Sequence, residues 1–168
     1  MKIFKMTVFL SVVGAIIACV LYFTNAITAP IIAENNQIKT EKILREMVGK
    51  MDSYDIVEVN DGPLENIYNI KQGGKITSSV LRIQTFGFQS EIELLVLIKD
   101  NKFQGFEVVQ QAETAGYGTQ IVDNQEYRSQ FKNKSINENI DTITGATVTT
   151  AKVKEAVEES VAIYEKMK

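Results

Sequence analysis

A long stretch without charged residues in the N-terminal part of this chain constrains its architecture more than any other feature. No Asp, Glu, Lys or Arg lies between Met6 and Ala33. At about 1.5 Å per residue, the apolar run from Thr7 to roughly Ile27 can cross the ~30 Å hydrocarbon core of a bilayer with little tilt. We therefore expect one transmembrane helix, and a chain divided into an anchor, residues 1–33, and an outer domain, residues 34–168.

The charges that precede this segment predict its orientation. Lys2 and Lys5 lie on its N-terminal side, and Lys and Arg next to membrane spans are biased toward the cytoplasm. We expect a single pass through the lipid of the cell membrane, with the N-terminus in the cytoplasm and the outer domain on the extracytoplasmic side.

The same segment has two other interpretations. A basic start followed by an apolar run is also typical of a cleaved signal peptide. The sequence AIIAC, which ends at Cys19, resembles a lipoprotein cleavage box with Cys19 as the lipid acceptor. Because the apolar run continues past Cys19 through VLYF, where a mature exported protein normally turns polar, the permanent anchor is favoured.

Composition excludes several kinds of chemistry. The chain has no His, so it cannot form a Ser-His-Asp triad, a His general base or a His-ligated metal site. Its single Cys cannot form an internal disulfide or hold an iron–sulfur cluster. A net charge of −3 offers no basic surface for phosphate contacts, so nucleic acid is not an expected partner. Redox chemistry would need a bound cofactor.

The outer domain has the pattern of the α+β class. Pro30 is expected to end the membrane helix, and residues 35–51 carry apolar side chains at helical spacing. Short segments rich in branched and aromatic residues then predict a mostly antiparallel sheet of four to six strands. These segments are 55–59, 66–70, 79–88, 91–100 and 103–110, with a tight turn at Asp100-Asn101.

Helical patterns follow the strands. Residues 124–131 predict a short helix or helical turn. The C-terminal residues predict a long helix with one apolar stripe: Val153, Ala156, Val157, Val161 and Tyr164. We expect an antiparallel sheet packed against helices, preceded by the single N-terminal membrane helix.

Two loops of small residues lead into helical patterns, and these are the candidate sites. They are ETAGYGTQI, residues 113–121, and DTITGATVTT, residues 141–150. A helix N-terminus has unpaired N–H groups and favours phosphate, although neither loop is a dinucleotide fingerprint or a Walker A motif. The residues alone favour a plain structural interpretation, in which Thr147 or Thr149 caps the last helix and Glu113 is a solvated acid.

Both loops resemble motifs of one family. DTITGATVTT is similar to the D-x-x-[ST]-G-A-T signature of subunits in which the last Thr carries FMN through a phosphoester bond made by a flavin transferase. ETAGYG resembles the E-T-P-G-[LF]-G loop of the same FMN-binding domain. The resemblance covers nearly the whole chain. It is strongest to the G subunit of the Rnf complex, an ion-translocating ferredoxin:NAD oxidoreductase, and next to the C subunit of the Na+-translocating NADH:quinone reductase.

The resemblance implies the site residues. Thr147 would bear the FMN phosphate on its Oγ1, and three residues would complete the attachment loop: Thr144, Gly145 and Ala146. Asp141 occupies the acidic position of the motif. The second loop would lie close to the flavin through Glu113, Thr114, Gly116 and Gly118.

The function that the resemblance implies is electron transfer in a redox-driven ion translocase. The chain would be a flavoprotein subunit without an independent active site, and its partners would be other membrane subunits of an Rnf-type complex. Alternatives are a C-type subunit of the quinone reductase and a free-standing anchored FMN protein of extracellular electron transfer. A pilin also combines an apolar N-terminal helix with an α+β head, but the Glu expected early in such a helix is missing between Met6 and Ala33.

Overall fold

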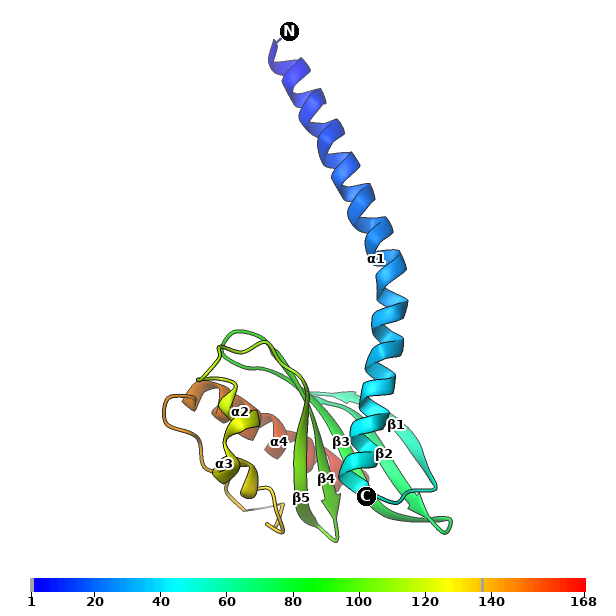
Figure 1. Ribbon diagram of the computed structural model, residues 1–168, viewed down its shortest axis with the longest axis vertical. Helices are drawn as coiled ribbons and strands as arrows, with labels where there is room; N and C mark the ends of the chain where they lie inside the picture. Colours follow the sequence, from blue (N-terminus) through cyan, green and yellow to red (C-terminus); the bar gives the residue numbers. More distant parts are fainter. Residues whose placement is uncertain (1, 137) are drawn as a thin grey trace. The chain divides into compact units, whose positions relative to one another are not determined.

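The computed structural model describes residues 2–136 and 138–168 and divides into two compact units (Figure 1). The first unit ends at Glu41, and the second comprises Lys42–Lys168. Helix α1, Lys2–Val48, provides the described part of the first unit, and its last residues belong to the second.

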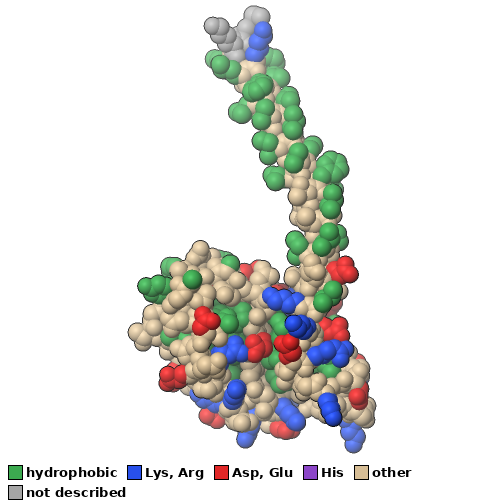
Figure 2. Space-filling view, in the orientation of Figure 1, with side chains coloured by type: hydrophobic (Ala, Val, Ile, Leu, Met, Phe, Trp, Pro, Cys, Tyr) green, Lys and Arg blue, Asp and Glu red, His purple; other side chains and the backbone are tan. Residues whose placement is uncertain are grey.

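The N-terminal part of α1 is a candidate membrane span by length and composition. Apolar side chains surround this part of the helix in Figure 2. The hydroxyls of Thr7, Thr24 and Thr28 donate to the carbonyl oxygens four residues earlier, at 3.1, 2.9 and 2.9 Å. These hydroxyls therefore have hydrogen-bond acceptors within the helix and need none from water. Polar groups within the hydrocarbon of a bilayer must be satisfied in this way.

The expected helix stop at Pro30 is wrong, because α1 continues through this residue. A proline inside a helix removes one hydrogen bond and crowds the carbonyl four residues earlier, which kinks a helix without necessarily ending it. The helix ends instead at Val48, where Gly49 has a positive φ of 77° and its N–H donates to the Arg45 carbonyl at 2.9 Å. A left-handed glycine is a common helix stop.

Five antiparallel strands form one meander in the order β1-β2-β3-β4-β5, which confirms the predicted sheet. The strands are β1 Ser53–Asp61, β2 Leu64–Gln72, β3 Lys75–Phe86, β4 Glu91–Lys99 and β5 Lys102–Gln110. The predicted tight turn joins β4 to β5, and Asp100 and Asn101 have φ values of 51° and 60°. Two positive φ values are typical of the two-residue turn that matches strand twist.

Helices cover one face of this sheet. They are α2 Gln120–Asp123, α3 Gln125–Ser129 and α4 Thr147–Met167, and α4 packs on β3 (Figure 1). The predicted apolar stripe of α4 faces the hydrophobic core between the helices and the sheet. In this stripe Val153, Ala156, Val157 and Val161 are buried, and Tyr164 is partly buried against the core. The α+β class is thereby confirmed.

A second apolar cluster lies on the other face of the sheet. Tyr68, Val80 and Leu95 pack there with Leu44, which belongs to the last turns of α1. Because both faces are covered, β4 is buried from Ile92 to Ile98, and its part from Leu94 to Ile98 is a continuous apolar run rather than a strict alternation.

Candidate functional site

A pocket of about 490 Å³ lies where α4 begins. Three segments that are distant in sequence supply its walls: the β3–β4 loop, the loop after β5, and the first residues of α4. The lining residues are Phe88, Glu113, Thr114, Tyr117, Gly118, Gly145, Ala146, Thr147, Val148 and Thr149. The fold therefore brings the two candidate loops together at a single site.

Not every candidate residue lines this pocket. Gly116 occupies the turn between Thr114 and Thr119 with a φ of 77° and is not part of the wall. Asp141 and Thr144 line a separate cleft of about 500 Å³. The predicted attachment motif is thus divided: its residues Asp141 and Thr144 line the separate cleft, and Gly145, Ala146 and Thr147 line the pocket.

Thr147 is the first residue of α4, and its side chain is exposed. Its hydroxyl donates to the Ile143 carbonyl at 3.2 Å. Thr149 and Thr150, in contrast, are 2% and 0% exposed. Among the three threonines of the TVTT segment, Thr147 alone is exposed.

The start of α4 has no side-chain cap. Ala146 holds the N-cap position, so the plain interpretation of Thr147 or Thr149 as the cap is wrong. Gly145 precedes it with a φ of 89°, a left-handed conformation that favours glycine. The first N–H groups of a helix have no acceptor within the helix. Here they belong to residues that line the pocket, where they favour an anionic group.

Glu113 is buried, with 7% of its surface exposed, and is not a solvated acid. Its Oε1 accepts from Gln89 N at 2.9 Å, Ser90 N at 2.8 Å and Ser90 Oγ at 3.2 Å. Its Oε2 accepts from Phe88 N at 3.2 Å and from Thr149 Oγ1 at 2.8 Å. Burial by itself raises the pKa of Glu113, but these hydrogen bonds outweigh it and lower the pKa below its ordinary value.

Two glycines make room for this carboxylate. A Cβ at Gly87 would lie 2.7 Å from Glu113 Oε1, and a Cβ at Gly118 would lie 2.5 Å from Glu113 Oε2. Gly118 therefore accommodates the glutamate side chain, and it also lines the pocket.

Sequence reasoning missed the β3–β4 loop as part of the site. Phe88 lines the pocket, and Gln89 and Ser90 donate to Glu113. The available signal was the glycine at position 87 in FGFQS, at the end of a long apolar strand.

Exposed apolar side chains flank the pocket. Phe88, Tyr117 and Val148 are 69%, 61% and 53% exposed, and all three belong to the lining. Aromatic and aliphatic walls with a few polar groups are typical of small-molecule sites, whose volumes are roughly 300–1,000 Å³.

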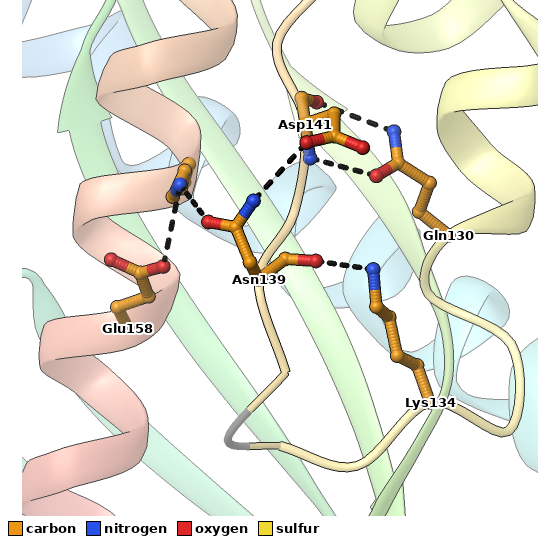
Figure 3. Close-up of polar contacts among 6 residues, drawn as sticks. Gln130, Lys134, Asn139, Asp141 and Glu158 are labelled. Carbon is orange, nitrogen blue, oxygen red and sulfur yellow. Dashed lines mark hydrogen bonds and ion pairs between the residues drawn. The ribbon is translucent and has the colours of Figure 1, made fainter.

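A polar network outside the pocket holds Asp141, the first residue of the predicted attachment motif (Figure 3). The Gln130 side chain accepts from Asp141 N at 2.7 Å and donates to Asp141 O at 3.3 Å. Asn139 Nδ2 donates to Asp141 Oδ1 at 3.1 Å, and Lys134 Nζ and Lys154 Nζ donate to Asn139. The Asp141 carboxylate thus contacts Asn139 and lies away from the pocket lining.

Residues 87–162 match the family described as FMN-binding domain. This segment contains every residue of the pocket lining. This match places the pocket-bearing segment in the class of FMN-binding domains.

Two relatives that match this chain over most of its length identify a narrower family within this class. The chain is 31% identical over 172 residues to the G subunit of the proton-translocating ferredoxin:NAD(+) oxidoreductase complex of Clostridium ljungdahlii, covering 95% of this chain and 87% of the relative. It is 26% identical over 195 residues to the G subunit of the Na(+)-translocating ferredoxin:NAD(+) oxidoreductase complex of Acetobacterium woodii, covering 98% and 93%. This chain belongs to the family of Rnf complex G subunits.

A solved structure shares the fold. The crystal structure of Shewanella oneidensis NqrC superposes with a TM-score of 0.50 and 18% sequence identity, covering 67% of this chain and 70% of that one.

Proposed function

We propose that this chain is the FMN-carrying electron-transfer subunit of an Rnf-type ferredoxin:NAD+ oxidoreductase, with FMN attached through a phosphoester to Thr147 Oγ1. The observation that carries the proposal is the exposed Thr147 hydroxyl on the wall of the pocket, at the uncapped start of α4. Family membership and the match to an FMN-binding domain support the same cofactor.

The residues present fit this cofactor. Phe88 and Tyr117 offer exposed rings beside the pocket, against which a planar ring system can pack. The free N–H groups at the start of α4 can donate to the phosphate oxygens, and the positive end of the helix dipole favours their charge. FMN, when bound, supplies the redox chemistry that this chain lacks, since it has no His and a single Cys.

The chain itself binds and positions the cofactor. Thr147 holds the phosphate, the first turn of α4 stabilises its negative charge, and the pocket walls set the environment of the ring. Glu113 and Thr114 belong to the wall on the opposite loop. We propose no independent active site, so ferredoxin and NAD+ would react at other subunits.

The anchor and the partners complete the proposal. Helix α1 would hold the protein in the membrane by a single pass, with the flavin-bearing domain on the extracytoplasmic side and other membrane subunits as partners. A covalent tether suits this location, because a cofactor released outside the cell would be lost by dilution. A dedicated flavin transferase would make the bond from an activated flavin donor of the flavin dinucleotide class: the Thr147 oxygen bonds to the flavin-side phosphorus, the phosphoanhydride bond breaks, the nucleoside monophosphate leaves, and the hydroxyl proton passes to a base of the transferase or to water.

Flavin fluorescence on a denaturing gel tests the covalent bond. Full-length protein produced with a flavin transferase should give a fluorescent band, and protein produced without the transferase should not. A dark band in both cases would contradict the proposal.

Fractionation and purification test the location and the partners. The protein should stay with the membrane fraction after alkaline extraction. Protease added to intact cells from which the outer layers have been removed should digest the Lys42–Lys168 unit. A tagged chain should also co-purify with other membrane subunits. Release by alkali, protection from protease, or purification as an isolated chain would each contradict one part of the proposal.

A further inference from the structure

We propose that Glu113 is a positioning residue, which fixes the direction of Thr147 and the place of Phe88 without binding the cofactor itself. This inference rests on the proposed function, since it concerns the same pocket. It differs from the expectation that Glu113 contacts the flavin.

The hydrogen-bonding capacity of Glu113 is already used. A carboxylate offers about four lone-pair sites. Within the described residues, the Glu113 carboxylate accepts five hydrogen bonds, four from the β3–β4 loop and one from Thr149. No acceptor site remains for a donor of a bound flavin.

The donors belong to the elements that form the pocket. Phe88, Gln89 and Ser90 lie in the β3–β4 loop, which carries the Phe88 ring into the wall, while Thr149 lies in α4. The loops have two further cross-links: Thr114 Oγ1 donates to Gln89 Oε1 at 2.7 Å, and Ala112 N donates to Ser90 Oγ at 2.9 Å. Glu113 therefore links the β3–β4 loop to the first turn of α4.

Helix geometry connects this contact to Thr147. At about 100° per residue, side chains two positions apart on a helix point roughly 200° apart. Thr149 faces inward to Glu113 and is buried, so Thr147 faces outward and is exposed. Holding Thr149 thus sets the rotation of the first turn of α4 and, with it, the direction of the Thr147 hydroxyl.

The contact is also sterically defined. Gly87 and Gly118 approach the Glu113 side chain so closely that a Cβ at either position would collide with it. The carboxylate is enclosed on both sides, so it acts as a fixed link rather than a mobile acid.

Steady-state kinetics of the flavin transferase, with the purified full-length chain as its protein substrate, test this role. Glu113→Gln replaces an acceptor oxygen by an NH2 donor that faces N–H groups, which should misplace the Thr147 hydroxyl. We therefore expect the kcat of the transferase to fall on the order of tenfold or more, with its KM for the chain nearly unchanged. Thr149→Val, which removes only the link to α4, should lower kcat in the same way. Glu126→Gln changes an exposed glutamate on α3 and is the matched control.

A purely structural role gives a different result. Loss of folded protein lowers the effective substrate concentration, which raises the apparent KM and leaves kcat unchanged. That result, or a wild-type kcat in both Glu113→Gln and Thr149→Val, would overturn the inference. If Glu113→Gln fails to fold by near-ultraviolet circular dichroism, Thr149→Val alone decides it.

A second readout separates positioning from direct contact. The readout is the absorption spectrum of the attached flavin in Phe88→Ala, in which the ring that Glu113 positions is already absent. Adding Glu113→Gln to Phe88→Ala should leave this spectrum unchanged, because the carboxylate does not touch the flavin. A further shift in the double variant would show contact and would overturn the inference. Wild-type protein that accepts no FMN would instead contradict the proposed function.

Discussion

Thr149 donates a hydrogen bond of 2.8 Å to Glu113 Oε2, and this buried contact ties the loop after β5 to the first turn of α4. The three threonines of the TVTT segment differ in their contacts. Thr150 is buried and bonds to the Ala146 carbonyl at 2.9 Å, and it accepts from Ile143 N at 3.1 Å. Thr149 holds Glu113, and Thr147 remains exposed. Each of the three hydroxyls thus has a distinct environment.

Removing the Thr147 hydroxyl should abolish covalent attachment. Thr147→Val keeps the shape of the side chain but provides no oxygen for the phosphoester, so the band on a denaturing gel should lose its flavin fluorescence. Thr147→Ser should retain some fluorescence, because it keeps a hydroxyl at the same place. Thr142→Val removes an exposed threonine outside the pocket and should label as the wild type does. A fluorescent Thr147→Val protein would mean that another residue carries the flavin.

Truncating the aromatic walls should expose the attached flavin without preventing its attachment. In Phe88→Ala and Tyr117→Ala, the ring system loses packing partners, so iodide should quench its fluorescence more strongly than in the wild type. Ile76→Ala is a control, since Ile76 is also exposed but does not line the pocket. Equal quenching in all four proteins would place the ring elsewhere.

Acid should destabilise the folded protein partly through Glu113. Its pKa is lower in the folded protein than the ordinary value of 4.5, so its contribution to stability is complete above about pH 4.5 and is lost as the pH falls through the folded pKa. Between pH 5 and 3, roughly, the thermal unfolding midpoint of the wild type should therefore fall more steeply than that of Glu113→Gln. Glu126→Gln should follow the wild type. If the unfolding midpoint fell equally with pH in all three proteins, the contribution of the Glu113 carboxylate to stability would be contradicted.

The core under the helices should depend strongly on Phe131. This residue is 0% exposed and contacts the rings of Phe103, Phe106 and Tyr127. Phe131→Ala should lower the free energy of unfolding by about 3–5 kcal/mol, because it removes apolar contacts and leaves a cavity. Phe86→Ala, at a position that is 61% exposed, should change it by less than about 0.5 kcal/mol. Denaturant titration of the full chain in detergent measures both, and similar losses would argue against this core.

Regular patterns allowed much of the fold to be predicted from sequence. The five strands, their antiparallel arrangement, the Asp100-Asn101 turn and the buried stripe of α4 agree with the structure. Local chemistry decides these features, since alternation, turn residues and helical spacing each act over a few residues. The passage of α1 through Pro30 was not predicted, because helical residues on both sides can outweigh one missing hydrogen bond.

The site was only partly predictable, since its shape depends on contacts distant in sequence. The motifs indicated Thr147 and Glu113, and both line the pocket. The sequence could not indicate that Glu113 accepts from the β3–β4 loop, or that Asp141 bonds to Gln130 and Asn139 away from the pocket. Those contacts depend on how the loops fold over the sheet, and the spacing of residues within either motif does not predict that.

The central claim is that Thr147 carries FMN, and mass spectrometry of the full-length chain produced with a flavin transferase tests it most directly. The intact protein should be heavier than the unmodified chain by the mass of one FMN less one water, and fragmentation of the peptide containing TGATVTT should place that mass on Thr147. An unshifted intact mass, or an added mass on any other residue, would contradict the account.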